Sequence, residues 1–183
     1  MPDASNTTEN PVSGERVLWL KTAADTDGEL LEWEHTLRPG AHVPRDHIHA
    51  VQEERFQVIA GTARVRLGNE LRDLNAGESI VIPRGTAHGL YNTTDAEARV
   101  RCELLPAKNT KAFFEITYAL AREGKVDKMG VPSIIRLAVI LSDLGEEHYQ
   151  PGIPIAVQKL GLVVLAPIGR LLGYRIAPSQ EGS

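Results

Sequence analysis

The sequence predicts a mainly β protein, a small barrel or sandwich, followed by a C-terminal α-helical extension. Two observations support this fold class. Short apolar runs before Pro106 are separated by Gly, Pro and Asn, which is typical of strands joined by tight turns. After Pro106 the apolar residues recur with helical spacing instead. We therefore expect a flexible arm or edge strand at 1–14, a β-barrel at 15–106 and a helical extension at 107–183.

The first strands follow from apolar content and alternation. Residues 16–22 can form a first strand, and the stretch from Leu31 to Leu37 alternates apolar and polar residues. This period of two is typical of a half-buried strand, so Trp33 and His35 should face the interior. Two interpretations of His35 stay open. It is either a hydrogen-bonded core histidine or a catalytic acid or base in a pocket that Trp33 helps to wall.

The later strands carry further candidate pocket residues. Residues 54–60 form a strand, and Gly68-Asn69 predicts the two-residue turn of the hairpin that follows. The inner face of the first of these strands carries Glu54, Phe56 and Val58. The last strand, at 96–105, turns Cys102 inward. The better interpretation of Cys102 is a small apolar filler, and the other is a thiol close to a bound metal.

Three helices are expected in the extension, from the positions of helix-starting Asn, Thr or Pro and helix-ending Gly. Their expected ranges are 109–124, 132–145 and 154–172. The third is apolar nearly all round, so we expect it to be buried against something. Only ten residues separate Lys159 from Arg170, which covers ~15 Å of a bilayer core of ~30 Å. A transmembrane segment is therefore not expected.

The third helix leaves three alternatives open: packing over the barrel, pairing with a second subunit, or lying on a membrane surface. We favour the first two together and expect a homodimer. Lys159 and Arg170 are too few to form the basic face of a helix that lies on lipid.

Four residues have the character and spacing of metal ligands. His47 and His49 are two apart and share one face of an extended chain, and Glu54 follows after a bend. His88 enters from a separate strand. Three imidazoles and a carboxylate suit a divalent transition metal. Glu53 is the alternative acidic ligand, but Glu54 shares the face of the apolar residues that follow it.

These residues resemble the two signature motifs of the cupin superfamily. The first, G(X)5HXH(X)3-4E(X)6G, is matched by His47, His49, Glu54 and Gly61, although six residues rather than five separate Gly40 from His47. The second, G(X)5PXG(X)2H(X)3N, is matched in full by Gly77, Pro83, Gly85, His88 and Asn92. The resemblance covers roughly residues 15–106. It implies a cupin-type double-stranded β-helix, or jelly-roll barrel, with one metal held by His47, His49, Glu54 and His88.

The resemblance also implies classes of activity without choosing among them. Dioxygenases, isomerases and decarboxylases are the expected types, and the metal could be Fe, Mn, Ni, Zn or Cu. A small, partly apolar organic substrate is expected because the inward-facing residues Trp33, Phe56, Val58 and Cys102 would wall the pocket. His35 is the candidate catalytic residue. The alternative is a non-catalytic module that binds or senses a small molecule.

Composition excludes several other classes. The net charge of −4 and the pI near 5.9 give no basic surface for nucleic acid. A single cysteine excludes an intramolecular disulfide framework and is compatible with a reducing compartment. The N-terminus lacks a charged-then-apolar signal, so a cytoplasmic location is expected.

Overall fold

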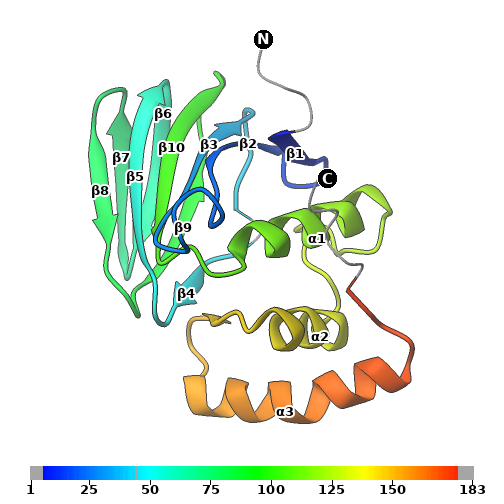
Figure 1. The fold of residues 1–183 in the computed structure, drawn as a ribbon. Helices are drawn as coiled ribbons and strands as arrows, with labels where there is room; N and C mark the ends of the chain where they lie inside the picture. The colour runs from blue at the N-terminus through cyan, green and yellow to red at the C-terminus, as the bar shows by residue number, and fades with distance from the viewer. Residues whose placement is uncertain (1–5, 44, 177–183) are drawn as a thin grey trace.

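The computed structural model describes residues 6–43 and 45–176, which fold into two antiparallel sheets and three helices (Figure 1). The first sheet has the strand order β1 (Thr7–Asn10), β2 (Glu15–Lys21), β3 (Leu31–Leu37), β10 (Ala98–Leu105), β5 (Glu53–Ala60) and β8 (Ser79–Ile82). The second has the order β11 (His148–Tyr149), β4 (His47–His49), β9 (Ala87–Tyr91), β6 (Thr62–Leu67) and β7 (Glu70–Asn75). The predicted fold class, mainly β with helices after the barrel, is confirmed.

The core lies between the two sheets. Its first-sheet contribution is centred on β10, where Cys102 is paired in register with Trp33 of β3 and with Phe56 of β5. The second sheet adds Val65 and Leu90, and all five side chains are buried. Alternation of inward and outward side chains along each strand produces this arrangement.

Strand β3 is more buried than its alternating sequence predicts. The outward-facing Glu32 is only 7 % exposed, although the alternation predicts a solvent-facing side there. The reason is that β3 lies between two strands with long cationic side chains. Lys21 Nζ lies 2.9 Å from Glu32 Oε2, and Arg101 Nε lies 3.6 Å from Glu32 Oε1. Their aliphatic stems cover the face while the charges stay near solvent.

The N-terminal segment contributes an edge strand. Strand β1 pairs with β2, and Asn10 Oδ1 then accepts hydrogen bonds from the backbone N–H groups of Val12 and Ser13. Of the two alternatives for residues 1–14, a flexible arm or an edge strand, the described part forms an edge strand. Residues 1–5 of that arm lie outside the described residues.

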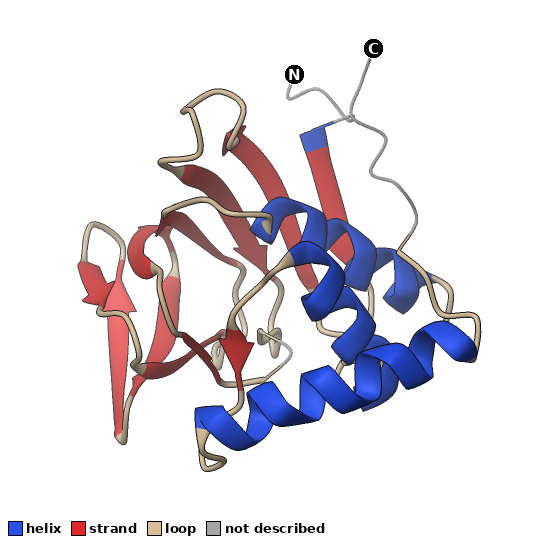
Figure 2. Cartoon of the chain, turned by 60° about the horizontal axis from the view of Figure 1, so that its bottom comes forward, coloured by secondary structure: helices blue, strands red, loops and turns tan. Residues whose placement is uncertain are grey.

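The helices are α1 (Thr110–Arg122), α2 (Ile134–Leu144) and α3 (Ile155–Leu171). Each begins and ends within two residues of its expected position. For α2 the signals are visible, because Ser133 Oγ accepts from the Arg136 N–H and Gly145 ends the helix with a φ of 62°. Helix α1 lies closest to the strands, α2 follows, and α3 is outermost (Figure 1), and Figure 2 shows the three helices together beside the strands.

Helix α3 packs on α2 rather than over the barrel, which was one of the alternatives expected for it. Within the described chain only the side that meets α2 is covered, at Ala166 and Gly169. A Cβ atom at Gly169 would lie 2.5 Å from Val139 Cγ2, so the missing side chain permits this close approach. The remaining surface exposes Val157, Leu160, Val163, Val164, Ile168, Leu171 and Leu172. Among the described residues no helix reaches the length and apolar content needed to cross a membrane.

Candidate metal centre

The four predicted ligands converge from both sheets. His47 and His49 lie on β4, and His88 lies on β9, which pairs with β4 so that His47 is opposite His88. Glu54 lies on β5 of the first sheet. The cluster therefore joins the two sheets at the end of the barrel that α1 approaches (Figure 1).

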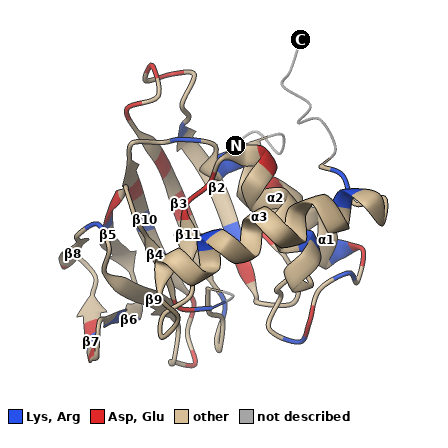
Figure 3. Ribbon diagram, turned by 90° about the horizontal axis from the view of Figure 1, so that it is seen from below, with Lys and Arg blue, Asp and Glu red and all other residues tan. Residues whose placement is uncertain are grey.

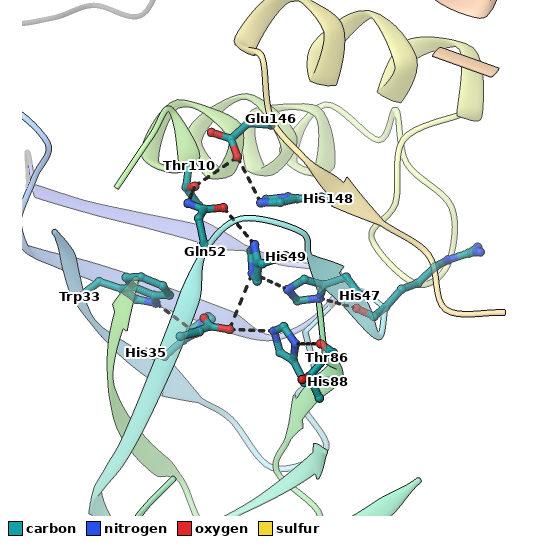
Figure 4. A network of polar contacts seen from close by, with 12 residues as sticks. Trp33, His35, His47, His49, Gln52, Thr86, His88, Thr110, Glu146 and His148 are labelled. Carbon is teal, nitrogen blue, oxygen red and sulfur yellow. Dashed lines mark hydrogen bonds and ion pairs between the residues drawn. The ribbon is translucent and has the colours of Figure 1, made fainter. Parts of the chain in front are cut away.

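The ligating atoms of this cluster lie close together (Figure 4). His47 Nε2 is 3.1 Å from His49 Nε2, and His88 Nε2 is 2.8 Å from Glu54 Oε2. His49 Nε2 is 3.7 Å from the same carboxylate oxygen. One ligand atom from each of the four residues lies within 4.8 Å of all the others. The cluster could therefore hold one metal ion.

Each imidazole of the cluster is oriented by a hydrogen bond on its other nitrogen. Nδ1 of His47 lies 3.0 Å from the Arg45 carbonyl oxygen, and Nδ1 of His88 lies 2.9 Å from that of Thr86. Nδ1 of His49 lies 3.2 Å from Gln52 Oε1. Because these acceptors require the proton on Nδ1, the lone pair of each ring is on Nε2, where the cluster converges.

Two atoms of the cluster are otherwise left without a suitable partner. Glu54 Oε2 and His88 Nε2 are buried and lie 2.8 Å apart. Neither atom makes a hydrogen bond of good geometry with any of the described residues. A buried polar atom without a partner is costly. A cation between the imidazoles and the carboxylate would satisfy both atoms, so the residues present fit the metal that the resemblance implies.

Burial keeps most of these imidazoles neutral. It lowers the pKa of His47 to about 4, and repulsion from His88 adds to the effect. Burial also lowers the pKa of His49 well below its ordinary value, helped by His148 and His47. For His88 burial acts in the same direction, but contact with Glu54 outweighs it and raises the pKa. Neutral imidazoles keep the lone pairs that a metal needs.

A cavity opens beside the cluster. The predicted wall residues Trp33 and Phe56 line it, together with Phe113 and Phe114 of α1 and Leu137 of α2. Val58 and Cys102 were also predicted to line the pocket, but they are buried within the sheet core and do not reach this cavity. Cys102 lies between larger neighbours on both adjacent strands, and burial raises the pKa of its thiol well above the ordinary value.

His35 lies deeper in the barrel. Its Nε2 atom is 2.9 Å from Glu15 Oε1, and its Nδ1 atom accepts a hydrogen bond of 3.4 Å from Trp33 Nε1. Ser13 Oγ donates to the other Glu15 oxygen. Both ring nitrogens of His35 thus face protein groups, although Nε2 makes no hydrogen bond of good geometry among the described residues, and His35 also lines the cavity. A catalytic role for His35 stays a prediction.

Sequence reasoning missed the contribution of the extension to this site. Strand β11 pairs with β4 so that His148 is opposite His49, and His148 lines the cavity. Gln52 was also missed, although it links His49 to α1 through Thr110 Oγ1 at 3.1 Å. A two-residue strand is too short to show alternation, and its partner is about a hundred residues away. No sequence signal marked these residues beyond their residue types.

The imidazoles also determine how the metal-free protein responds to acid. His47, His49 and His148 have pKa values below the ~6.5 of an unfolded histidine, so the unfolded chain takes up protons first as pH falls. The folded protein therefore loses stability as the pH falls below ~6.5 towards the folded pKa of each of these histidines. His88 and Glu146 act in the opposite direction, because contact with Glu54 raises the pKa of His88 and burial raises the pKa of Glu146.

We therefore expect the metal-free protein to melt at a clearly lower temperature at pH 5.5 than at pH 7.5. Differential scanning calorimetry after chelation would measure the difference. An equal or higher melting temperature at pH 5.5 would contradict the neutral state assigned to the buried imidazoles.

Comparisons with known proteins agree with this geometry. Residues 33–104 match a protein-family model described as "Cupin domain". Polyketide synthase CurC of Streptomyces cyaneus is 34% identical over 70 residues, which are 38% of this chain and 45% of that protein. The match thus spans less than half the length of this curated relative.

Two solved structures are similar in fold to more than half of the chain. KdgF from Halomonas sp. has a TM-score of 0.50 at 20% identity, over 57% of this chain and 89% of that chain. An RmlC-like cupin from Shewanella frigidimarina NCIMB 400 has a TM-score of 0.50 at 21% identity, over 59% and 91%. Residues 33–104 carry all four residues of the cluster and match the family model, and this segment of the chain is a cupin domain.

Proposed function

We propose that this protein is a metal-dependent enzyme that acts on a small, partly apolar organic molecule. One observation carries the proposal: His47, His49, Glu54 and His88 converge beside a cavity lined with aromatic and aliphatic side chains. We propose a divalent transition metal, one of Fe, Mn, Ni, Zn or Cu, as the occupant of the cluster, because imidazole and carboxylate suit these ions.

The bound metal would polarise a carbonyl or hydroxyl group as a Lewis acid or supply redox chemistry, as an isomerase, decarboxylase or dioxygenase requires. The protein residues would do the rest. Trp33, Phe56 and Phe114 would hold the apolar part of the substrate, and α1 would keep water away from it. His47, His49 and His88 would stay oriented because their Nδ1 atoms are already hydrogen bonded.

The curated relative is named a polyketide synthase, and polyketides carry carbonyl and hydroxyl oxygens on a carbon skeleton. We propose substrates of this general chemistry, with at least one oxygen able to bind the metal and an apolar remainder. The match covers 45% of the relative, so its name supports only the substrate class.

A second candidate, a non-catalytic binding module, is favoured by one specific observation. His35, the acid or base that the sequence predicts, already has Glu15 and Trp33 at its two ring nitrogens. It would have to exchange one of these partners to move a proton of a substrate. A site without such a group could bind a ligand and leave it unchanged.

The two candidates differ in what happens to a bound molecule. We expect purified protein to carry about one transition metal per chain and to convert members of a panel of hydroxy-ketones and phenols, detected by mass spectrometry. Oxygen uptake during conversion would indicate a dioxygenase, and conversion without oxygen an isomerase or decarboxylase. Ligands recovered unchanged from the metal-loaded protein would support the binding module. Protein that takes up no metal would contradict both candidates.

We also propose that the chain forms a homodimer through α3. The exposed residues Val157, Leu160, Val164, Ile168 and Leu171 are spaced by three or four, which is the seam of a helix that pairs with another helix. Exposed fractions from 42% to 88% along this seam make an apolar surface unusual for a monomer.

The charges around α3 favour a protein partner over lipid. Figure 3 shows that Lys and Arg lie near the two ends of α3 and that the stretch of helix between them has no charged residue. Lys159 Nζ lies 3.6 Å from Glu147 Oε2, and Arg170 pairs with Asp143. Both cations are therefore already neutralised within the chain, and no basic face remains for anionic headgroups.

Replacing Leu160 and Val164 with glutamate should convert the dimer to a monomer, because two charges would be buried without partners at the seam. Sedimentation velocity of wild type and variant would show this. Leu71→Glu is the control, since Leu71 is 53% exposed on β7, outside the helical extension. A wild-type protein that stays monomeric at high concentration, or that binds neutral lipid vesicles through α3, would contradict the proposal.

A further inference from the structure

The C-terminal extension places a fourth histidine beside the metal cluster. Strand β11 pairs with β4 so that His148 is directly opposite His49. Directly opposite residues of an antiparallel pair point to the same face of the sheet, so His148 faces the barrel interior. Its ring centroid lies 4.5 Å from that of His49 and 5.9 Å from that of His47 (Figure 4). His148 also lines the cavity, and its side chain is 10% exposed.

His148 lies beside a buried carboxylate. Glu146 Oε2 lies 3.3 Å from His148 Nε2, and the Glu146 side chain is completely buried. The backbone N–H of Asn109 donates to Glu146 Oε1 at 2.7 Å, and Thr110 Oγ1 donates to Oε2 at 3.3 Å. Phe113 packs edge-on against the imidazole, with ring centroids 4.7 Å apart. The start of α1 thus fixes both the carboxylate and the histidine.

The two nitrogens of His148 therefore have different surroundings. A carboxylate beside Nε2 favours the proton on that nitrogen, which leaves Nδ1 as a hydrogen-bond acceptor. Nε2 makes no hydrogen bond of good geometry among the described residues in spite of its 3.3 Å approach to Glu146, and Nδ1, the nitrogen away from Glu146, belongs to a ring that lies next to the cavity. His148 is not one of the four residues whose metal-ligating atoms converge. Its position therefore suits contact with a bound small molecule rather than with the metal.

We propose that His148 is a ligand-binding residue, whose Nδ1 atom accepts a hydrogen bond from a hydroxyl group next to the oxygen that binds the metal. The inference rests on the proposed metal-dependent function and extends it. It assigns a substrate class, compounds with two neighbouring oxygens of which one keeps its proton. It also gives the extension a direct part in specificity, because both His148 and Glu146 come from β11 and the residues before it.

Cobalt-loaded protein offers a direct test, because the visible spectrum of bound Co²⁺ changes when a ligand binds. The probes are catechol, which keeps a second hydroxyl, and its monomethyl ether, which does not. His148→Phe keeps an aromatic ring but removes the acceptor. It should weaken catechol binding about tenfold, the size of one hydrogen bond, and change binding of the methyl ether less than twofold. Metal content should stay at the wild-type value.

Two further variants complete the test. His148→Gln restores an acceptor oxygen and should recover part of the preference for catechol, which separates acceptor loss from misfolding. His42→Phe is the matched control, because His42 lies outside the cavity.

The outcomes separate the inference from the proposed function. Equal effects of His148→Phe on both probes, loss of metal in that variant, or no binding of catechol to the cobalt-loaded wild type would overturn the inference. A wild-type protein that takes up no cobalt would overturn the proposed function as well.

Discussion

Replacing His88 with alanine should abolish stoichiometric metal binding. The substitution removes one of three Nε2 atoms and leaves Glu54, 2.8 Å away in the native site, without its nearest partner. Loss of a residue that only orients a ligand lowers metal affinity about 10–100-fold, and loss of a ligand should cost more. Inductively coupled plasma mass spectrometry on protein purified with added metal should find far less than one ion per chain.

His42→Ala is the matched control for this experiment. His42 is a half-buried histidine of the same barrel, its Nδ1 atom lies 2.9 Å from the Val43 carbonyl oxygen, and it is outside the cluster. It should keep the full metal content. If His88→Ala and His42→Ala retained equal amounts of metal while both were folded, the ligand assignment would be wrong.

Gln52→Ala should weaken metal binding without removing any ligand. Gln52 Oε1 accepts from His49 Nδ1, and its Nε2 atom donates to the Pro106 carbonyl oxygen at 2.9 Å and to Thr110 Oγ1 at 3.1 Å. The substitution leaves His49 free to rotate and removes the connection to α1. We expect a 10–100-fold loss of metal affinity and about 1–3 kcal/mol of destabilisation from the buried groups left without partners.

Competition with a chromophoric chelator would measure the affinity, and urea denaturation the stability. Gln57→Ala is the control, because Gln57 lies on β5, the strand that follows Gln52, and its side chain is exposed. It should leave both quantities unchanged. Wild-type affinity in Gln52→Ala would show that His49 does not need this hydrogen bond.

The metal cluster was predictable because it depends on short-range sequence patterns, namely strand alternation and turn residues. His47 and His49 share one face of a strand whatever their partner strands are, and the turns before and after them are marked by glycine and proline. Glu54 was chosen over Glu53 from alternation alone, and the structure brings Glu54 into the cluster. The helix ends were predictable for the same reason: Pro132 and Gly145 predict the limits of α2, and the structure places the cap one residue after Pro132, at Ser133.

The rest of the site depends on contacts that are distant in sequence. His148 joins His49 across about a hundred residues through a strand of two residues, which has no periodicity of its own. Gln52 gains its role only because the Pro106 segment and α1 lie beside it. The side chains of Val58 and Cys102 face the interior, as the alternation predicts. Alternation cannot distinguish a side chain packed in the core from one that lines a cavity.

The central claim is that His47, His49, Glu54 and His88 bind one transition metal ion together. A crystal grown from metal-replete protein and measured across the absorption edge of the bound element tests it directly. We predict one anomalous difference peak, with the Nε2 atoms of the three histidines and a Glu54 oxygen each about 2.0–2.2 Å from it. A crystal with no peak between these side chains, or with its metal elsewhere on the chain, would contradict the account.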